Sequence, residues 1–303
     1  MKLGDLDQGE VGAMLMADGV YLRMSPFVAR IQSDIPVIRD SLREMYSDFP
    51  LADAQSFTDF QVRVSYEPGI RKWISPLVRF YFDGRPSFTP LPAHQAFAML
   101  EWGLNWCVAA HAHQYLIVHA AVVERNGRAF VFPAPPGSGK STLCAALVNR
   151  GWRLLSDELG LIDMETSTVL GMARAVNLKN NSIEIIKRYA PDVRFTSVVP
   201  DTTKGTIALM QPPTESVLRA GEPGRPCCFI LPKYSPETDI RLDPYSKART
   251  CMLLAEQSFN YHVHGLRGFE TFSSLVAAAK CFSLTYSRLD DAVSLLNDLS
   301  ENL

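Results

Sequence analysis

A glycine-rich segment near the middle of the chain restricts the fold more than any other feature of the sequence. The run AFVFPAPPGSGKSTLCAAL, residues 129–147, places Gly137, Gly139 and Lys140 between two apolar stretches. Glycines let the backbone turn its N–H groups toward an anion, and a helix that begins near Lys140 directs its positive N-terminal end to the same point. Strand, glycine-rich turn and helix in this order are typical of a phosphate-binding α/β domain, so we predict the α/β fold class.

The same segment predicts a P-loop, or Walker A, nucleotide site. It departs from the pattern G-x-x-x-x-G-K-[ST] because Ala134 stands at the first glycine, and the two prolines that follow favour a turn there. We expect Lys140 to reach the β- and γ-phosphates and the Ser141 hydroxyl to bind Mg²⁺. ATP and Mg²⁺ are the expected cofactors, and GTP stays an alternative because no base-reading motif is visible. The predicted nucleotide-binding residues are Pro136, Gly137, Ser138, Gly139, Lys140, Ser141 and Thr142.

Two adjacent acids and one histidine are candidates for the chemistry beside this loop. Asp157 and Glu158 follow a short predicted strand over residues 153–155, and ligands of α/β sheets gather at the carboxyl ends of strands. A carboxylate there can accept the proton of an attacking hydroxyl or bind Mg²⁺. The alternative is a solvated turn. His119, in a predicted strand over 115–124, can face the same pocket or simply hydrogen-bond to backbone.

The remaining pattern divides the chain near residue 92. The pattern predicts a mixed, β-rich accessory region over residues 1–92, which we expect to recognise a partner, and a P-loop domain over residues 93–303. The dipeptides Asp83-Gly84 and Asn126-Gly127 predict tight hairpin turns. We expect strands over 60–65, 77–82, 115–124, 128–132, 153–155, 159–163 and 228–231, and helices over 37–45, 93–113, 143–150, 247–258, 270–281 and 290–299.

Composition and charge exclude several classes of protein. The net charge of −2 and the lack of a basic stripe argue against a nucleic-acid partner. The longest apolar stretch, residues 97–110, is interrupted by Glu101 and Asn105 and is too short for a membrane span. The N-terminus lacks the apolar core of a secretory signal, and none of the 6 cysteines belongs to a C-x-x-C pair. We therefore expect a cytoplasmic protein with free thiols and no membrane partner.

The chain resembles the core of the HPr kinase/phosphorylase family over residues 116–163, LIVHAAVVERNGRAFVFPAPPGSGKSTLCAALVNRGWRLLSDELGLID. The family has a strand with a histidine, a glycine-containing hairpin, the P-loop, a helix ending in Arg-Gly and a pair of acids in this order. His119 precedes Lys140 by 21 residues and Asp157 follows it by 17, as in the family. Thr142 and Glu158 stand where the family commonly has an acid and a second aspartate. The chain therefore resembles the broader group of HprK-related kinases.

The resemblance implies an HPr-kinase type of fold and a role for each matching residue. Asp157 would be the general base toward a serine hydroxyl, and His119 would lie next to it and support it. Lys140 and the loop amides would hold the phosphates, while Ser141 would bind Mg²⁺ with help from Glu158 through water. Relatives include enzymes that phosphorylate serine in ribosomal peptides, some beside PqqD-like carrier proteins, which implies a peptide or small-protein partner. The family is often oligomeric, which leaves a homo-oligomer open.

The leading functional hypothesis is an ATP-dependent kinase that transfers the γ-phosphate to a hydroxyl, in particular a serine of a peptide or small protein. Two alternatives stay open: a kinase of a small hydroxylated metabolite, and a non-catalytic nucleotide-binding regulatory module. A cation from outside the loop should help to stabilise the transferring phosphoryl group. The candidates for this cation are Lys179, Lys204 and Arg241.

Overall fold

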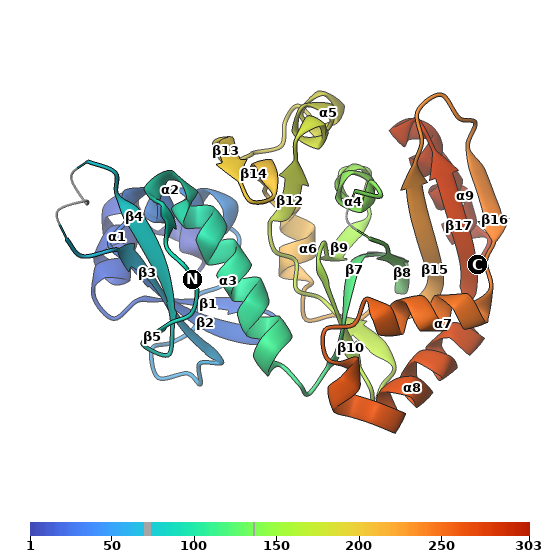
Figure 1. Cartoon of the computed structure of the whole chain (residues 1–303), viewed down its shortest axis with the longest axis horizontal. Coiled ribbons are helices and arrows are strands. Elements are labelled where there is room, and N and C mark those ends of the chain that lie inside the picture. The colour runs from blue at the N-terminus through green and yellow to red at the C-terminus, as the bar shows by residue number, and fades with distance from the viewer. Residues whose placement is uncertain (70–73, 136) are drawn as a thin grey trace.

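The computed structural model describes residues 1–69, 74–135 and 137–303 and has a mixed α/β architecture (Figure 1). An N-terminal sheet with its helices lies on one side, and a central sheet that carries the glycine-rich segment lies on the other. A small third sheet lies near the top, between the two. The predicted α/β class is confirmed. Pro136, one of the predicted phosphate-binding residues, lies outside the described residues.

The N-terminal sheet combines parallel and antiparallel pairing. Its strands follow the order β1-β2-β3-β4-β5, and β6 pairs with β4. Strands β2 and β3 run parallel because α2, Pro36–Met45, connects them, whereas the other pairs are antiparallel. The predicted strands over 60–65 and 77–82 are confirmed. The strands are β1 Val20–Met24, β2 Phe27–Ser33, β3 Phe60–Tyr66, β4 Leu77–Phe82, β5 Arg85–Pro86 and β6 Leu91–Pro92, and α1, Gln8–Met16, precedes them.

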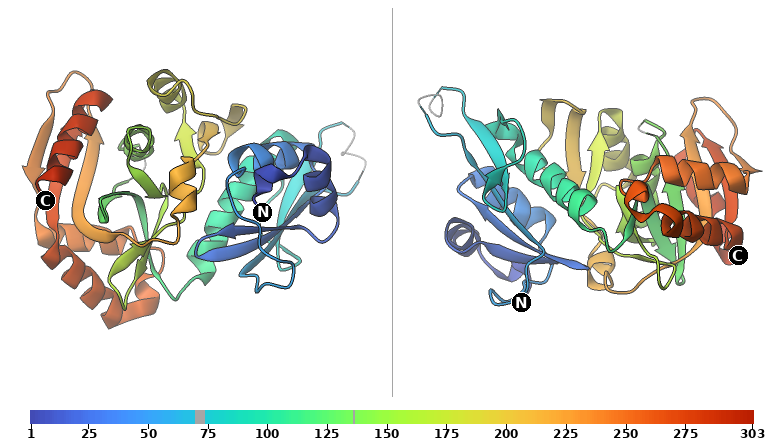
Figure 2. Two further views of the ribbon diagram at one scale, coloured as in Figure 1. Left: turned by 180° about the vertical axis from the view of Figure 1, so that it is seen from behind. Right: turned by 60° about the horizontal axis from the view of Figure 1, so that its bottom comes forward.

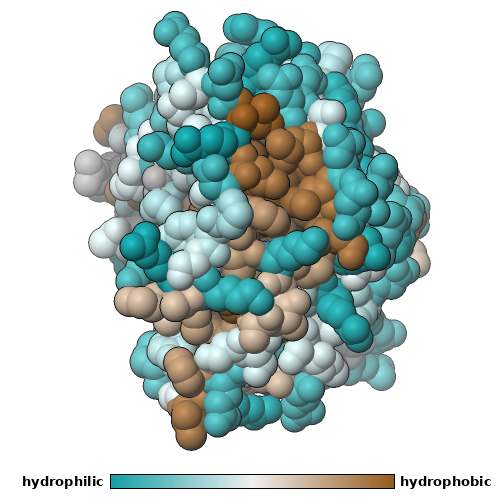
Figure 3. All heavy atoms as spheres, turned by 90° about the vertical axis from the view of Figure 1, so that its right-hand side faces the viewer, coloured by the Kyte–Doolittle hydropathy of each residue, from teal (hydrophilic) through white to brown (hydrophobic). Residues whose placement is uncertain are grey.

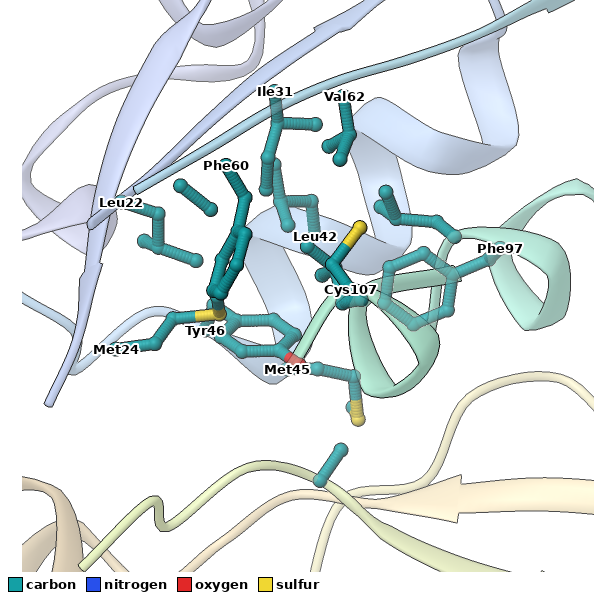
Figure 4. Packing of buried hydrophobic residues seen from close by; sticks show 14 of the residues in the cluster. Leu22, Met24, Ile31, Leu42, Met45, Tyr46, Phe60, Val62, Phe97 and Cys107 are labelled. Atoms are coloured by element: carbon teal, nitrogen blue, oxygen red, sulfur yellow. The ribbon is translucent and has the colours of Figure 1, made fainter. Parts of the chain in front are cut away.

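Helix α3, Ala96–His111, packs on this sheet and closes its core. A Cβ atom on Gly103 would lie 2.2 Å from the ring of Phe80, so the helix can approach β4 this closely only at a glycine. Figure 4 shows Phe97 and Cys107 of α3 among the side chains of α2 and the strands. The same cluster continues into the rest of the chain through Leu159, Leu161, Met172 and Leu209. The N-terminal sheet and the central part of the chain therefore share one hydrophobic core.

The central sheet places the glycine-rich segment at the end of β8. Its strand order is β11-β10-β7-β8-β15-β17-β16, and β9 also pairs with β7. Strands β8, β15 and β17 are parallel, and antiparallel strands continue the sheet on both sides. Asn126-Gly127 turns β7 into β8 as the sequence predicts, with positive φ at both residues. The strands are β7 Leu116–Arg125, β8 Arg128–Pro133, β9 Arg153–Ser156, β10 Leu159–Asp163, β11 Thr168–Leu170, β15 Arg225–Tyr234, β16 Arg241–Pro244 and β17 Lys280–Tyr286.

Helices cover both faces of the central sheet, as the alternation of side chains along β8 requires. Phe130 and Phe132 point into a hydrophobic cluster with α4 and α9, whereas Ala129 and Val131 point into the opposite cluster with α7 and α8. Figure 2 shows α9 and the α7–α8 pair on different sides of the strands. The helices are α4 Lys140–Val148, α7 Lys247–Glu256, α8 Tyr261–Ala278 and α9 Leu289–Glu301.

The third sheet borders both the glycine-rich loop and the N-terminal region. Its antiparallel strands follow the order β12-β14-β13. The amide of Gln95 donates to the carbonyl oxygen of Asp201 over 3.3 Å and ties the start of α3 to β13. The elements are β12 Val176–Lys179, α5 Asn181–Tyr189, β13 Val199–Thr202 and β14 Gly205–Met210, and α6, Thr214–Leu218, follows them.

One predicted helix is wrong at its C-terminal end. The sequence predicts a helix over 270–281, but α8 begins earlier, at Tyr261, and ends at Ala278. Cys281 instead lies in β17, where it pairs with Phe229 of the parallel strand β15. The partner strand lies some fifty residues earlier in the chain, so local pattern could not reveal this pairing.

At the edge strand β16, part of the hydrophobic cluster that packs with α4 and α9 reaches the protein surface. Figure 3 shows hydrophobic residues gathered on the face where β16, β17 and α9 lie, with hydrophilic residues around them. The partly buried hydrophobic residues of this region are Ile240, Leu242, Phe282, Leu289, Leu295, Leu299 and Leu303. As for the helices, none within the described ranges combines the length and the apolarity that a bilayer span needs.

Candidate functional site

The glycine-rich loop has an open backbone that two neighbouring strands support. Gly137 and Gly139 have φ values of +86° and +91°, in the region that favours glycine. A Cβ on Gly137 would meet nothing within 4 Å, so the loop leaves room above this residue. The Tyr286 hydroxyl at the end of β17 donates to the Gly139 carbonyl over 3.2 Å. The backbone N–H of Tyr234, at the end of β15, donates to the Ser138 carbonyl over 3.0 Å.

Helix α4 begins at Lys140, whose ammonium lies inside the site. Lys140 is 7% exposed, and its Nζ lies 2.9 Å from His119 Nε2. Burial and the nearby Lys140 lower the pKa of His119 to about 4, while Glu158 and Gln257 act in the opposite direction. The imidazole is therefore neutral at pH 7, and its Nε2 accepts the hydrogen bond from the ammonium. Burial also lowers the pKa of Lys140, which Asp157 and Glu158 oppose.

Asp157 lies at the same edge of the sheet as the loop. Strands β8 and β9 both pair antiparallel with β7, so their carboxyl ends point the same way, toward Lys140 and Asp157. Asp157 is 6% exposed, and its Oδ2 accepts from the backbone N–H of Asn177 over 3.1 Å. Its Oδ1 has no hydrogen-bond partner among the described residues. Burial and the neighbouring Glu158 raise the pKa of Asp157 to about 6, although Lys140, the Asn177 amide and Ser141 oppose the shift.

Further charged groups surround this carboxylate. Glu158 accepts a hydrogen bond from the side-chain amide of Asn105 on α3. Lys204, in the turn between β13 and β14, places its Nζ 4.9 Å from the centre of the Trp102 ring. Burial lowers the pKa of Lys204, and Glu158 raises it. Lys179, at the end of β12, lies close enough to lower the pKa of both Lys140 and Lys204. The acid pair is thus surrounded by cations.

A cavity of about 20 Å³, the size of one water molecule, lies between α3 and the acid pair. Asp157 and Glu158 line it from the bend between β9 and β10, Trp102 and Asn105 from α3, and Asn177 from β12. The side-chain oxygen of Asn177 and the indole N–H of Trp102 are buried and have no partner among the described residues. Unpaired buried polar groups cost free energy, which favours a polar ligand or water at this position.

The structure brings most of the predicted site residues to one place. Gly137, Ser138, Gly139, Lys140, Ser141 and Thr142 form the loop and the first turn of α4. His119 reaches the site but contacts Lys140, so an effect of His119 on Asp157 passes through that lysine. Of the outer cations, Lys204 lies near Glu158 and Lys179 lies near Lys140, whereas Arg241 lies on the edge strand β16 and pairs with Asp243.

Four contributors to the site are not evident from the sequence: Trp102, Asn105, Asn177 and Tyr286. Asn105 and Glu158 are 53 residues apart, and Gly139 and Tyr286 are 147 apart, so only the fold joins them. Trp102 and Asn105 lie at positions i and i+3 of a mainly apolar helix, so they share a face. That spacing is the one signal that could have pointed to this wall of the site.

The residues fit a magnesium-nucleotide. The buried hydroxyl of Ser138 has no hydrogen-bond partner among the described residues, and the loop above Gly137 is open, as a phosphate cradle requires. Ser141, Asp157 and Glu158 supply oxygen donors of the type that Mg²⁺ prefers. The described residues hold no group of three or more His, Cys, Asp and Glu side chains suited to a metal.

Comparison with known proteins finds a family model and solved structures that are similar to this chain. Residues 93–172 match the family described as SynChlorMet cassette protein ScmC, and this range contains His119, the loop and the acid pair. A solved structure, the Hpr(Ser) kinase/phosphatase from Coxiella burnetii, matches with 13% sequence identity and a TM-score of 0.28. The match covers 61% of this chain and 94% of that chain. No curated protein matches this sequence. Neither match assigns an activity to this chain.

Proposed function

We propose that this protein is a kinase that transfers the γ-phosphate of ATP to a hydroxyl group, specifically the serine hydroxyl of a peptide or small protein. One observation carries the proposal. Asp157, a buried carboxylate with one oxygen unpaired among the residues that the structure describes, lies at the same strand edge as an open glycine-rich loop and its lysine. The proposed site thus combines a phosphate cradle, a positive charge and a proton acceptor.

The phosphate-binding half consists of the loop and the start of α4. The N–H groups of residues 137–142 and the N-terminal end of α4 would hold the β- and γ-phosphates. Lys140 would leave its hydrogen bond to His119 and bind phosphate oxygens, and neutral His119 keeps the ammonium in place until then. Bound Mg²⁺, held by Ser141 with help from Glu158, would neutralise charge on the β- and γ-phosphates.

Asp157 is the proposed general base. Its raised pKa of about 6 leaves it ionised at pH 7 but basic enough to accept a proton from a hydroxyl. The hydroxyl oxygen forms the new bond to the γ-phosphorus, the bond to the β–γ bridging oxygen breaks, and the proton goes to Asp157. ADP leaves with the bridging oxygen. The enzyme contributes position and charge rather than a covalent intermediate.

Lys204 is the proposed second cation. It lies in a turn, beside Trp102 and near Glu158, so a small movement of the β13–β14 hairpin would bring it to the transferring group. Lys179 lies on strand β12, where it pairs with Ile207 of β14, whereas Lys204 lies in a turn outside the strands. Of the two, Lys204 is therefore better suited to follow a phosphate that moves between donor and acceptor.

The test uses a tagged γ-phosphate analogue of ATP with Mg²⁺, added to host lysate with the wild-type protein or with Asp157→Asn. Label on a protein or peptide in the wild-type sample alone is the expected result. Label confined to small molecules would indicate a metabolite kinase instead. Equal label in both samples, with nucleotide bound by both proteins, would contradict the kinase and leave a nucleotide-binding module.

A further inference from the structure

A chain of buried polar contacts connects the N-terminal region to the acid pair. The hydroxyl of Tyr46, just after α2, donates to Glu101 Oε1 over 2.6 Å. Arg174 binds the other oxygen of Glu101 and also donates to Asn105 Oδ1 over 2.6 Å. Asn105 Nδ2 then donates to Glu158 Oε2. The ion pair inside this chain is almost fully desolvated, because Glu101 is 4% and Arg174 5% exposed.

The two partners of Asn105 fix the direction of its amide. A guanidinium carries donors only, so the oxygen of the amide must face Arg174. A carboxylate carries acceptors only, so the NH₂ group must face Glu158. A flipped amide would oppose donor to donor and acceptor to acceptor at once. Asn105 therefore presents a hydrogen-bond donor to Glu158, and the buried charge of Arg174 maintains that direction.

The position of Asn105 also places it at the reaction site rather than in the core. It lines the small cavity beside Asp157 and Glu158, and Trp102, one turn earlier on the same face, holds Lys204. The apolar face of α3 packs on the N-terminal sheet, and this polar face looks toward the acids. Helix α3 thus joins the N-terminal core to Glu158 and to Lys204, the proposed metal-binding acid and the proposed second cation.

We infer that Asn105 is a positioning residue that orients the Glu158 carboxylate toward the magnesium-nucleotide, with Arg174 and its ion pair to Glu101 as its support. The inference rests on the proposed function and extends it, because it makes α3, which packs on the N-terminal sheet, a working part of the site. Residues behind a metal-binding carboxylate commonly affect metal affinity about tenfold or more when they are removed.

A double-mutant cycle on the full-length protein tests this inference. The variants are Asn105→Ala, Glu158→Gln and the two combined, and the measurement is the affinity for a fluorescent ATP analogue with and without Mg²⁺. Each single change should weaken the affinity with Mg²⁺ by about tenfold and leave the affinity without Mg²⁺ within about twofold. The double variant should be no weaker than the worse single variant, because both changes break one contact. Asn105→Asp, which keeps the partner of Arg174 but opposes Glu158 with a carboxylate, should weaken binding in the same Mg²⁺-dependent way.

Tyr46→Phe is the matched control, since it removes a hydrogen bond at the far end of the same chain of contacts. It should lower the unfolding midpoint but not change the dependence on Mg²⁺. The role of Asn105 would be overturned if the two losses of nucleotide affinity multiplied in the double variant. Equal losses of affinity with and without Mg²⁺ would also overturn it. A wild-type protein that binds the magnesium-nucleotide but transfers no phosphate would contradict the proposed function alone, because the binding cycle needs no transfer.

Discussion

Asp157 keeps a charge in a place where burial opposes it. Its pKa lies near 6 in the folded protein, compared with a usual value of 3.8. Between these values the folded protein binds a proton that the unfolded chain does not bind, so stability falls as the pH rises through this window. The free-energy cost of keeping Asp157 ionised in the folded protein is fully present above pH 6. A group that the fold holds at such a cost is a candidate for function rather than for stability.

Replacement of Asp157 by asparagine should therefore stabilise the nucleotide-free protein. Above pH 6 we expect a gain in the free energy of unfolding on the order of 1–3 kcal/mol, and below pH 4 we expect no difference between variant and wild type. His119, whose lowered pKa makes stability rise between about pH 4 and its usual 6.5, contributes the opposite slope to both proteins and drops out of the comparison. Urea unfolding from pH 4 to pH 8 measures the difference. A variant less stable than wild type at pH 7 would show that Asp157 is a structural residue.

Lys204 and Arg241 give a matched test of the outer cation. Lys204→Ala should lower the transfer rate on the order of tenfold to a hundredfold with a small change in nucleotide affinity, because the contact forms as the phosphoryl group moves. Lys204→Arg should retain much of the rate. Arg241→Ala should behave as wild type, since this residue is exposed and paired with Asp243 on the edge strand. Equal losses in Lys204→Ala and Arg241→Ala under steady-state conditions would remove Lys204 from the proposed mechanism.

At the residue scale, motif chemistry predicts part of the site and misses the rest for a physical reason. Gly137, Lys140 and Asp157 carry their signal in local order, because a loop, a helix start and a strand end are adjacent in the chain. Asn177 carries no such signal, and Asn105 carries only its helical spacing from Trp102. Each is an ordinary polar residue until the fold places it beside a carboxylate that lies 53 or 20 positions away.

Among the elements, the glycine-rich loop depends on two features of Gly139: its positive φ and its close contact with Tyr286. Comparison with a second glycine separates their effects. Gly139 has φ of +91° and a Cβ there would lie 2.6 Å from the Tyr286 hydroxyl, whereas Gly151 has φ of +90° and nothing within 4 Å. Gly139→Ala and Gly151→Ala should each cost about 1–2 kcal/mol of stability through the left-handed conformation. Only Gly139→Ala should also weaken ATP binding, because it displaces the loop. Thermal unfolding and a fluorescent-nucleotide titration separate the two effects, and unchanged affinity in Gly139→Ala would argue against this loop as the nucleotide site.

Elements with local signals are predicted well, and those that depend on distant partners are not. Asn126-Gly127 turns β7 into β8 because both residues tolerate positive φ. The end of α8 is missed because Ala277, Ala278 and Ala279 continue a helical pattern, while β17 forms only by pairing with β15. Strands β1 and β2 have the same dependence on pairing across a sheet.

For the whole molecule, the predicted boundary near residue 92 stays a prediction, and the packing shows what it depends on. The cluster around Phe80 and Tyr46 includes Phe97, Leu100 and Leu104 of α3, so the helix after the boundary is buried by the strands before it. The buried pair of Arg174 and Glu101 also relies on this helix. The sequence indicates where the composition changes, but not that the two sides share a core.

Removal of residues 1–92 tests this dependence. The remaining chain would expose the apolar face of α3, and Glu101 would lose the hydroxyl of Tyr46 while it still neutralises a buried arginine. Exposure of several large apolar side chains costs about 1.5–3 kcal/mol for each one, which is comparable with the whole stability of a domain. We therefore expect residues 93–303 alone to be insoluble or to lack a cooperative unfolding transition, and full-length protein prepared in parallel is the control. A soluble fragment that unfolds cooperatively and binds the fluorescent nucleotide with wild-type affinity would instead establish 93–303 as an independent domain. It would also restrict the role of α3 to contacts within that domain.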